Sequence, residues 1–326
     1  GFLRSLVTPV VKVSRRSESL SFYNLYDYQE WKTQTGGGVG WTTKYYKGLG
    51  TSTAAEAREY FRNLNKHNLK YNIDESSMER LNLAFAKSEA DKRKVWVTQP
   101  IDKTAMGYEK GTESVSYSQF IDKELIQFSI ADVKRSIPSL VDGLKPSQRK
   151  VLYGCMKRNL TSDTKVAQLS GYISEHTAYH HGEMSLQGCI IDMAQDYVGS
   201  NNINLLLPKG QFGTRIMGGK DHASARYIFT MLNPMTRSIF RPEDDAILNY
   251  LDDDGYKIEP ETFFPVLPMV LVNGAQGIGT GYSTNIPSYN PKDIIKNIRN
   301  FIIGEPMVEM TPWFKGFKGE VTPKTE

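Results

Sequence analysis

The sequence has few of the features that mark secreted and membrane proteins. Among its 326 residues are two cysteines, Cys155 and Cys189, which excludes a disulfide-rich framework and predicts a reducing compartment. The longest apolar run extends from Phe263 to Val272, contains two prolines and is too short to cross a bilayer. We expect a buried pair of strands or a core turn there, and no membrane partner.

An excess of one charge is also absent. The chain has 40 Lys and Arg against 36 Asp and Glu, a net charge of +4, so it is not a basic tail. With 39% hydrophobic and 23% charged residues, the composition is typical of a globular protein. Because 326 residues exceed the usual size of one domain, we expect two or more domains.

The first third of the chain mixes strand and helix patterns. Alternating residues from Leu3 to Val13 predict a strand. Thr53 and Glu56 have the spacing of a capping box, and the helix after them is predicted to bury one apolar face. That face comprises Ala57, Tyr60, Phe61 and Leu64. A polar connector is expected from Asp102 to Ser118, overlapping the start of a helix over residues 116–129.

From about Arg135 the pattern favours a winged helix, in which helices are followed by a strand hairpin. One helix begins at Pro146 and another follows Gly182. The first buries Val151, Leu152, Cys155 and Met156 and exposes Lys150, Lys157 and Arg158; the second aligns Leu186, Cys189, Ile190, Met193 and Tyr197. Strand-like segments at 203–207 and 227–232 follow.

A last helix is predicted at Pro291, with Asn290 as its cap. Its inward side is expected to consist of Ile294, Ile295, Ile298 and Phe301.

Positive charge collects between Gly143 and Val166, where Asp163 is the sole acidic residue. The basic residues are Lys145, Arg149, Lys150, Lys157, Arg158 and Lys165. Such a face can neutralise phosphates. A solvated helix surface explains the same pattern, and the residues alone leave both interpretations open.

Three further motifs resemble ligand sites. His180 and His181 are adjacent, so they point in different directions and suit phosphate or base contacts, or local hydrogen bonds, better than a metal. "GTRIMGGKD" imitates a phosphate-binding loop, but Lys220 is followed by Asp221 and not by Ser or Thr. We reject a nucleotide site there and keep a loop that approaches a DNA phosphate. "LDDDG" predicts a charged hairpin turn.

Two side chains raise sharper alternatives. Ile278 lies among glycines in "NGAQGIGTG", where it either packs inward on a turn or acts as a wedge between base pairs; the residues alone favour the first. Tyr227 follows Arg226, which can stabilise a phenolate or a phosphate under attack. In an extended segment the two side chains would point to opposite faces, and Arg226 would instead hold the neighbouring phosphate. A core strand aromatic is the ordinary alternative.

Several blocks together resemble the breakage–reunion core of eukaryotic-type DNA topoisomerase II, a type IIA enzyme. They are "YYKGLGTST", "RSIPSLVDGLKPSQRKVLYGC", "YHHGEMSL", "GSNNINLLLPKGQFGTR", "GGKD…ARYIFT" and "PMVLVNGAQGIGTGYS". The resemblance implies that Tyr227 forms a 5′-phosphotyrosyl bond, that Arg226 assists it, and that Ile278 bends DNA. It further implies DNA contacts by Lys145, Tyr179, Arg93 and Lys94, and weaker ones by Arg135, His181, Gln211 and Lys220.

The resemblance also implies an α/β plus α+β multidomain fold. Residues 1–125 would be the C-terminal part of a TOPRIM domain and a connector, 126–282 a winged-helix domain, and 283–326 the beginning of an α/β tower domain. The family acts on double-stranded DNA as a homodimer, with ATP and Mg²⁺, and the nucleus is the expected location. The family's metal-binding carboxylates and ATPase domain precede Gly1, so we expect an excised piece that binds DNA and cleaves it poorly alone.

Two alternatives stay open. One is a non-catalytic winged-helix DNA-binding subunit that uses Tyr227 structurally. The other is one natural subunit of a split topoisomerase. The adjacent Arg226 and Tyr227 argue against the first.

Overall fold

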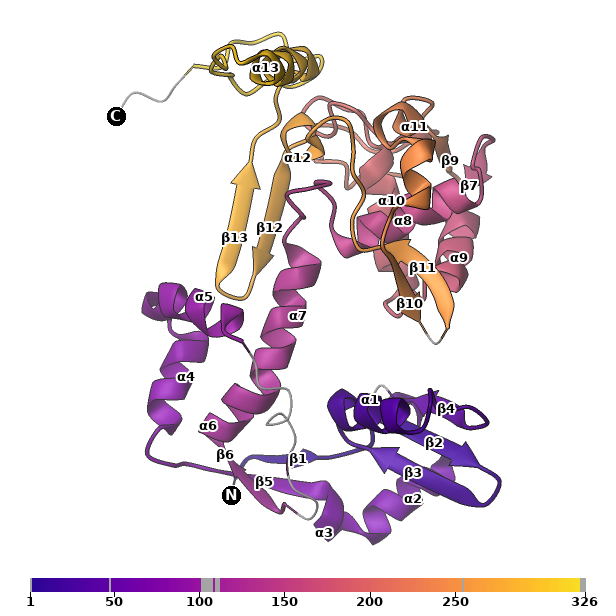
Figure 1. Ribbon diagram of the computed structural model, residues 1–326, viewed down its shortest axis with the longest axis vertical. Coiled ribbons are helices and arrows are strands. Elements are labelled where there is room, and N and C mark those ends of the chain that lie inside the picture. The colour runs from indigo at the N-terminus through magenta and orange to yellow at the C-terminus, as the bar shows by residue number, and fades with distance from the viewer. Residues whose placement is uncertain (1, 47, 101–107, 109–111, 254, 323–326) are drawn as a thin grey trace. The chain divides into compact units, whose positions relative to one another are not determined.

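The computed structural model describes residues 2–46, 48–100, 108, 112–253 and 255–322. It contains two compact units, Gly1–Ala131 (unit 1) and Asp132–Glu326 (unit 2), which mix helices with small sheets (Figure 1). The prediction of a mixed α/β chain is therefore confirmed. Much of the connector predicted from Asp102 lies outside the described residues. No helix among the described residues has the length and apolar character needed to cross a membrane.

The described residues of unit 1 form two three-stranded sheets. The first has the order β3-β2-β4 and the second β1-β5-β6. The strands are β1 (Arg4–Leu6), β2 (Val11–Arg15), β3 (Glu18–Phe22), β4 (Thr42–Tyr45), β5 (Asn68–Asn72) and β6 (Ser114–Ser116). The single strand predicted from Leu3 to Val13 is wrong, because the chain passes from one sheet to the other around Pro9, which has no N–H to donate.

The helices of unit 1 are short. They are α1 (Leu25–Gln34), α2 (Ala54–Arg62), α3 (Leu64–His67), α4 (Ser77–Phe85), α5 (Ala90–Thr98) and α6 (Tyr117–Phe120), followed by a π-helical turn at Ile121–Leu125. The capping box of α2 is confirmed. Its predicted apolar face is only partly correct: Tyr60 is buried, whereas Phe61 is exposed and Leu64, which lies beyond the end of α2, is exposed as well.

Glu56 joins β4 to the start of α2. Its carboxylate accepts hydrogen bonds from the Thr53 amide at 2.8 Å, from Lys44 Nζ at 3.0 Å and from the Tyr46 hydroxyl. Burial alone would raise the pKa of Glu56, but these hydrogen bonds outweigh it and lower the pKa to about 2. The charged carboxylate therefore stabilises unit 1.

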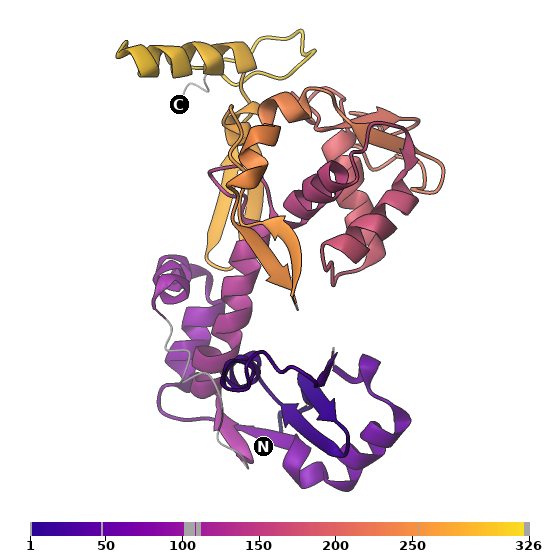
Figure 2. The same cartoon turned by 45° about the vertical axis from the view of Figure 1, so that its right-hand side comes forward.

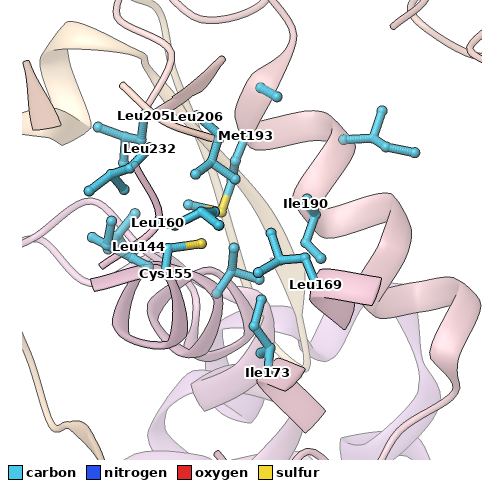
Figure 3. Close-up of a cluster of buried hydrophobic side chains, with 14 of the residues drawn as sticks. Leu144, Cys155, Leu160, Leu169, Ile173, Ile190, Met193, Leu205, Leu206 and Leu232 are labelled. Atoms are coloured by element: carbon cyan, nitrogen blue, oxygen red, sulfur yellow. The ribbon is translucent and has the colours of Figure 1, made fainter. Parts of the chain in front are cut away.

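Unit 2 is built on helices that pack around one apolar core. α7 (Ile126–Ser136) leads into it, and α8 (Pro146–Lys157), α9 (Val166–His176) and α10 (Glu183–Ala194) form the core. Buried side chains from these helices point toward one another (Figure 3). Fully buried residues include Val151, Leu152, Cys155, Leu169, Ile173 and Ile190. The predicted helix starts at Pro146 and after Gly182 are confirmed.

Three small sheets of short strands belong to the described part of unit 2. β7 (Thr164–Lys165), β9 (Phe229–Leu232) and β8 (Leu206–Lys209) form an antiparallel sheet in that order. β10 (Tyr250–Asp253) and β11 (Tyr256–Pro260) pair on either side of the predicted charged turn, of which Asp254 lies outside the described residues. A hairpin consists of β12 (Ala275–Gly279) and β13 (Tyr282–Ile286). Figure 2 shows both pairs of strands from another side.

The apolar run from Phe263 to Val272 is not a pair of strands. It is irregular up to Pro268 and ends in the helical turn α12 (Met269–Val272), because its two prolines interrupt strand pairing. The run does contribute to the core, since Phe263 and Val272 are buried. α11 (Thr236–Ile239) and a 3₁₀ turn at Pro242–Ala246 precede it.

The last helix, α13 (Pro291–Ile303), begins as predicted, with Asn290 as its cap. Ile294 is buried and Ile298 partly so, but Ile295 and Phe301 are exposed, which contradicts the prediction. The covered stripe is narrow because it continues through Asn297, whose side chain exchanges two hydrogen bonds of 2.7 Å with the Val308 backbone.

Two of the residues predicted for the basic face are internal. Arg149 donates to buried Asp142 at 2.7 and 3.0 Å. Lys150 lies 2.8 Å from Glu259 of β11. Both side chains neutralise carboxylates of unit 2, so the basic face predicted over Gly143–Val166 is smaller than expected. Lys157, Arg158 and Lys165 are exposed.

We expect Asp142→Ala to destabilise unit 2 by about 3–5 kcal/mol, because it leaves the Arg149 guanidinium buried without its counter-ion. Hydrogen–deuterium exchange should become faster in α8 and β11 and stay unchanged in α4 of unit 1. The exposed Asp163→Ala is the matched control. Equal exchange in both variants would contradict the assigned role of Asp142.

A second prediction concerns pH. The pKa of Glu56 is about 2 in the folded chain and 4.5 ordinarily, so its contribution to stability is complete above the ordinary value and is lost as pH falls toward about 2. Urea titrations at about pH 6 and about pH 3 should show a smaller loss of stability in Glu56→Gln than in the parent chain. Glu30→Gln, on the exposed side of α1, should behave like the parent.

Candidate functional site

Tyr227 lies on an exposed turn. Its amide donates to the Ser224 carbonyl at 2.9 Å, so residues 224–227 form a turn and not the extended segment considered from the sequence. Tyr227 is 71% exposed, which also contradicts a core aromatic. Its neighbour Arg226 is exposed, whereas Ala225 and Ile228 on either side are buried. The turn therefore presents these two side chains together.

The turn is held on the first residues of α9 through its backbone. The Val166 amide donates to the Ile228 carbonyl at 3.1 Å, and the Ala167 amide to the Ala225 carbonyl at 3.0 Å. Amides at a helix start have no partner within the helix, so these carbonyls supply one. The positive end of the α9 dipole consequently lies near Tyr227, where it favours negative charge.

Arg226 adds a cation at the same place. Its guanidinium carbon lies 5.8 Å from the centre of the Tyr227 ring. The Arg226 guanidinium and the start of α9 both lie near the exposed Tyr227 side chain. Positive charge in this position stabilises negative charge that develops on a phenolate or on a phosphate. The geometry therefore agrees with nucleophilic chemistry at the Tyr227 oxygen.

Ile278 lies on β12, one residue before the hairpin turn, and is 78% exposed. The neighbouring glycines face α7: a Cβ on Gly277 would lie 2.2 Å from the Ser136 carbonyl oxygen, and one on Gly279 would lie 3.1 Å from Val133 Cα. Because side chains alternate along a strand, Ile278 points away from α7. The hairpin lies beside the C-terminal end of α7 (Figure 1). The inward-packed alternative is wrong.

Asp132 of α7 holds the turn of this hairpin. Its Oδ2 accepts hydrogen bonds of 3.0 Å from both the amide and the hydroxyl of Thr280. Its Oδ1 accepts from Arg135 at 3.0 Å. Burial alone would raise the pKa of Asp132, but the hydrogen bonds from Arg135 and Thr280 outweigh it and lower the pKa. Sequence reasoning missed Asp132 and Thr280, since no local pattern links residues so far apart.

The other predicted DNA contacts occupy varied environments in unit 2. His181, Gln211 and Lys220 are exposed. Lys145 precedes α8, and its amide donates to Gln148 Oε1 at 2.9 Å. Tyr179 is 9% exposed, and its ring packs in the core with its centre 5.4 Å from that of His181.

Arg93 and Lys94 belong to unit 1, where Arg93 has a structural role. Its guanidinium donates to the Leu83 carbonyl at 2.9 Å and to the Ala86 carbonyl at 2.6 Å, which closes the C-terminal end of α4. Lys94 pairs with Asp91 at 2.8 Å. No sequence pattern indicates the contacts that Arg93 makes with backbone carbonyls.

His222 was not predicted, although it lies five residues before Tyr227. Burial raises the pKa of Asp192 on α10, and the nearby His222 and Lys145 side chains oppose that rise. Asp192 thus lies near Lys145, which precedes α8, and near His222 in the segment that leads to Tyr227.

Two family models match successive parts of the chain. Residues 135–326 match the family model for the A-type subunit of DNA gyrase/topoisomerase IV, and residues 6–133 match that for the C-terminal associated domain of TOPRIM. The chain is 53% identical over 331 residues to DNA topoisomerase 2 of Drosophila melanogaster, covering 98% of this chain and 23% of the relative. It is 54% identical over 325 residues to that of Arabidopsis thaliana, covering 98% and 22%.

A solved structure is similar as well. The crystal structure of the Plasmodium falciparum topoisomerase II DNA-binding, cleavage and re-ligation domain matches with a TM-score of 0.79 and 52% identity, covering 99% of this chain and 44% of that one. The chain spans less than a quarter of the length of the two relatives above. It belongs to the DNA gyrase/topoisomerase IV family of type IIA topoisomerases.

Proposed function

We propose that this chain is the DNA breakage–reunion part of a type IIA topoisomerase. The Tyr227 oxygen attacks a DNA phosphodiester, forms a 5′-phosphotyrosyl bond and releases the 3′-hydroxyl of the neighbouring sugar. The exchange replaces one phosphoester by another, so the released hydroxyl can reverse it. The observation that carries the proposal is the exposed Tyr227 beside Arg226 on a turn anchored to the start of α9.

Ile278 is proposed to bend the DNA that Tyr227 cleaves. An apolar side chain can unstack a base step and kink the duplex, provided that its support does not yield. The exposed Ile278 side chain on a strand whose glycines lie against α7 supports this role. The hydrogen bonds between Thr280 and Asp132 give the hairpin turn a fixed position.

The remaining DNA contacts are graded by their surroundings. Exposure supports His181, Gln211 and Lys220, and the position of Lys145 before α8 supports a phosphate contact. The side chains of Arg135 and Lys94 are about half exposed, although each forms an ion pair with a neighbouring aspartate. Tyr179 and Arg93 are proposed to act mainly by supporting their neighbours, since the ring of one is buried and the guanidinium of the other is bound to backbone.

The whole enzyme is proposed to work as a homodimer in the nucleus, to use ATP and Mg²⁺, and to pass one duplex through a break in another. We also propose the division into a TOPRIM part (1–125), a winged-helix domain (126–282) and the start of a tower domain (283–326). The packing of α8, α9 and α10 beside β8 and β9 supports the winged-helix domain. Among the described residues, no three His, Cys, Asp or Glu side chains lie together in a group that could hold a metal ion. The reaction proposed for Tyr227 therefore assigns no role to a metal ligand of these residues.

The direct test is covalent trapping on end-labelled duplex DNA with Mg²⁺, in the full-length protein. We expect Tyr227→Phe to lose the protein–DNA adduct by more than about 100-fold, because the attacking oxygen is absent. DNA binding should persist, since the turn is held by backbone atoms. The control is Tyr256→Phe, an exposed tyrosine on β11.

An adduct that survives in Tyr227→Phe would refute the proposal. DNA binding by the parent protein without any adduct would favour a non-catalytic DNA-binding role. An adduct that forms only when a separate partner chain is added would favour a split enzyme.

A further prediction concerns DNA bending. Thr280→Val removes one hydrogen bond between the hairpin turn and the Asp132 carboxylate, which weakens the support of Ile278 and should reduce the ratio of bent to straight DNA. Ile278→Ala should reduce it at least as strongly. Thr280→Ser keeps the hydroxyl and is the control. Energy transfer between dyes at the two ends of a short duplex measures the ratio, and equal bending by Thr280→Val and Thr280→Ser would contradict the role of this contact.

A further inference from the structure

The loop from Gly213 to Lys220, which follows β8, carries an apolar tip outside the site described above. Ile216 is 93% exposed and Met217 55% exposed. Single exposed apolar side chains are common on protein surfaces. These two are adjacent, and the loop that presents them has a fixed structure.

Two buried or charged groups close the base of the loop. The Gln195 side chain is buried, and its Nε2 donates to the Phe212 carbonyl at 2.9 Å and to the Gly219 carbonyl at 3.2 Å. The Asp221 carboxylate accepts from the amide and the hydroxyl of Thr214 at 2.8 and 2.9 Å. The beginning and the end of the loop are therefore held together by Gln195 and by Asp221.

Two glycines make this closure possible. Gly213 has φ 95° and Gly219 has φ 77°, in the left-handed region. A Cβ on Gly213 would lie 2.5 Å from the Gly219 oxygen, and one on Gly219 would lie 2.3 Å from Gln195 Nε2. The loop thus holds Ile216 outward through close backbone contacts.

The base of the loop lies beside the Tyr227 turn. The Ala223 amide donates to the Gln211 carbonyl at 2.9 Å, and a Cβ on Gly210 would lie 3.1 Å from the Ile228 side chain. Between residues 209 and 227 the basic residues are Lys209, Arg215, Lys220 and Arg226. The one carboxylate in this segment is that of Asp221, which is already bound to Thr214.

We propose that Ile216 and Met217 form a second apolar contact with duplex DNA, close to the phosphate that Tyr227 attacks, and that this contact helps to select the cleavage site. The inference rests on the proposed function. An apolar tip flanked by cations suits a polyanion whose groove exposes base edges, and proteins use Ile and Met in this way in the minor groove. A second copy of the chain suits it less, because a two-fold contact would bring like charges together.

Site-specific photocrosslinking tests the contact. A benzophenone amino acid replaces Ile216 in the full-length protein, which is irradiated with a duplex that carries one strong cleavage site. The control places the same group at Ile247, which is 76% exposed in unit 2. We expect position 216, and not 247, to crosslink to DNA within a few nucleotides of the cleaved bond.

Crosslinking of position 216 to a second copy of the protein, or to nothing, would overturn the inference. The Tyr227 adduct is measured in the same samples. An adduct without a 216–DNA crosslink would refute this contact and leave the proposed function intact, whereas loss of the adduct from the parent protein would refute the proposed function itself.

Cleavage-site preference is the second readout. In a library of duplexes, Ile216→Ala should change the relative use of individual sites by at least about 5-fold. Ile216→Leu keeps the apolar contact and should retain the parent profile. Identical profiles for Ile216→Ala and the parent protein would contradict a role in site selection.

Discussion

The site depends on two backbone hydrogen bonds at the start of α9. They bind the carbonyls of Ala225 and Ile228 to amides that would otherwise have no partner. Because both carbonyl residues are buried, the two side chains between them have to face outward. The backbone position of Tyr227 is thus fixed by the packing of α9 in the core of unit 2, and the Gln195 contacts place the loop before it on the same support.

Local signals made much of the fold predictable. Pro146 and the cap Asn290 mark helix starts correctly because their effect is limited to one turn. Arg149 and Lys150 were predicted on a basic surface because charge is all that the sequence shows of them. Their burial depends on carboxylates, and the one that binds Lys150 is Glu259, which is distant in the sequence and becomes its neighbour only through tertiary packing.

In the candidate site, too, local signals were readable from the sequence and tertiary contacts were not. The family resemblance implied roles for Tyr227 and Ile278, whereas residue patterns alone favoured an inward isoleucine. What exposes Ile278 is the close approach of Gly277 to the Ser136 carbonyl, together with the bond from Thr280 to Asp132. No periodic pattern or motif in the sequence indicates either contact, so neither could be predicted before the structure.

The backbone anchoring of the Tyr227 turn has an evolutionary consequence. Neither the Arg226 nor the Tyr227 side chain takes part in the hydrogen bonds that hold the turn, and both are exposed. Folding of unit 2 would therefore tolerate many residues at these two positions, and selection for stability would not maintain an arginine followed by a tyrosine. A lineage that lost the chemistry would be free to lose this pair first and keep the fold.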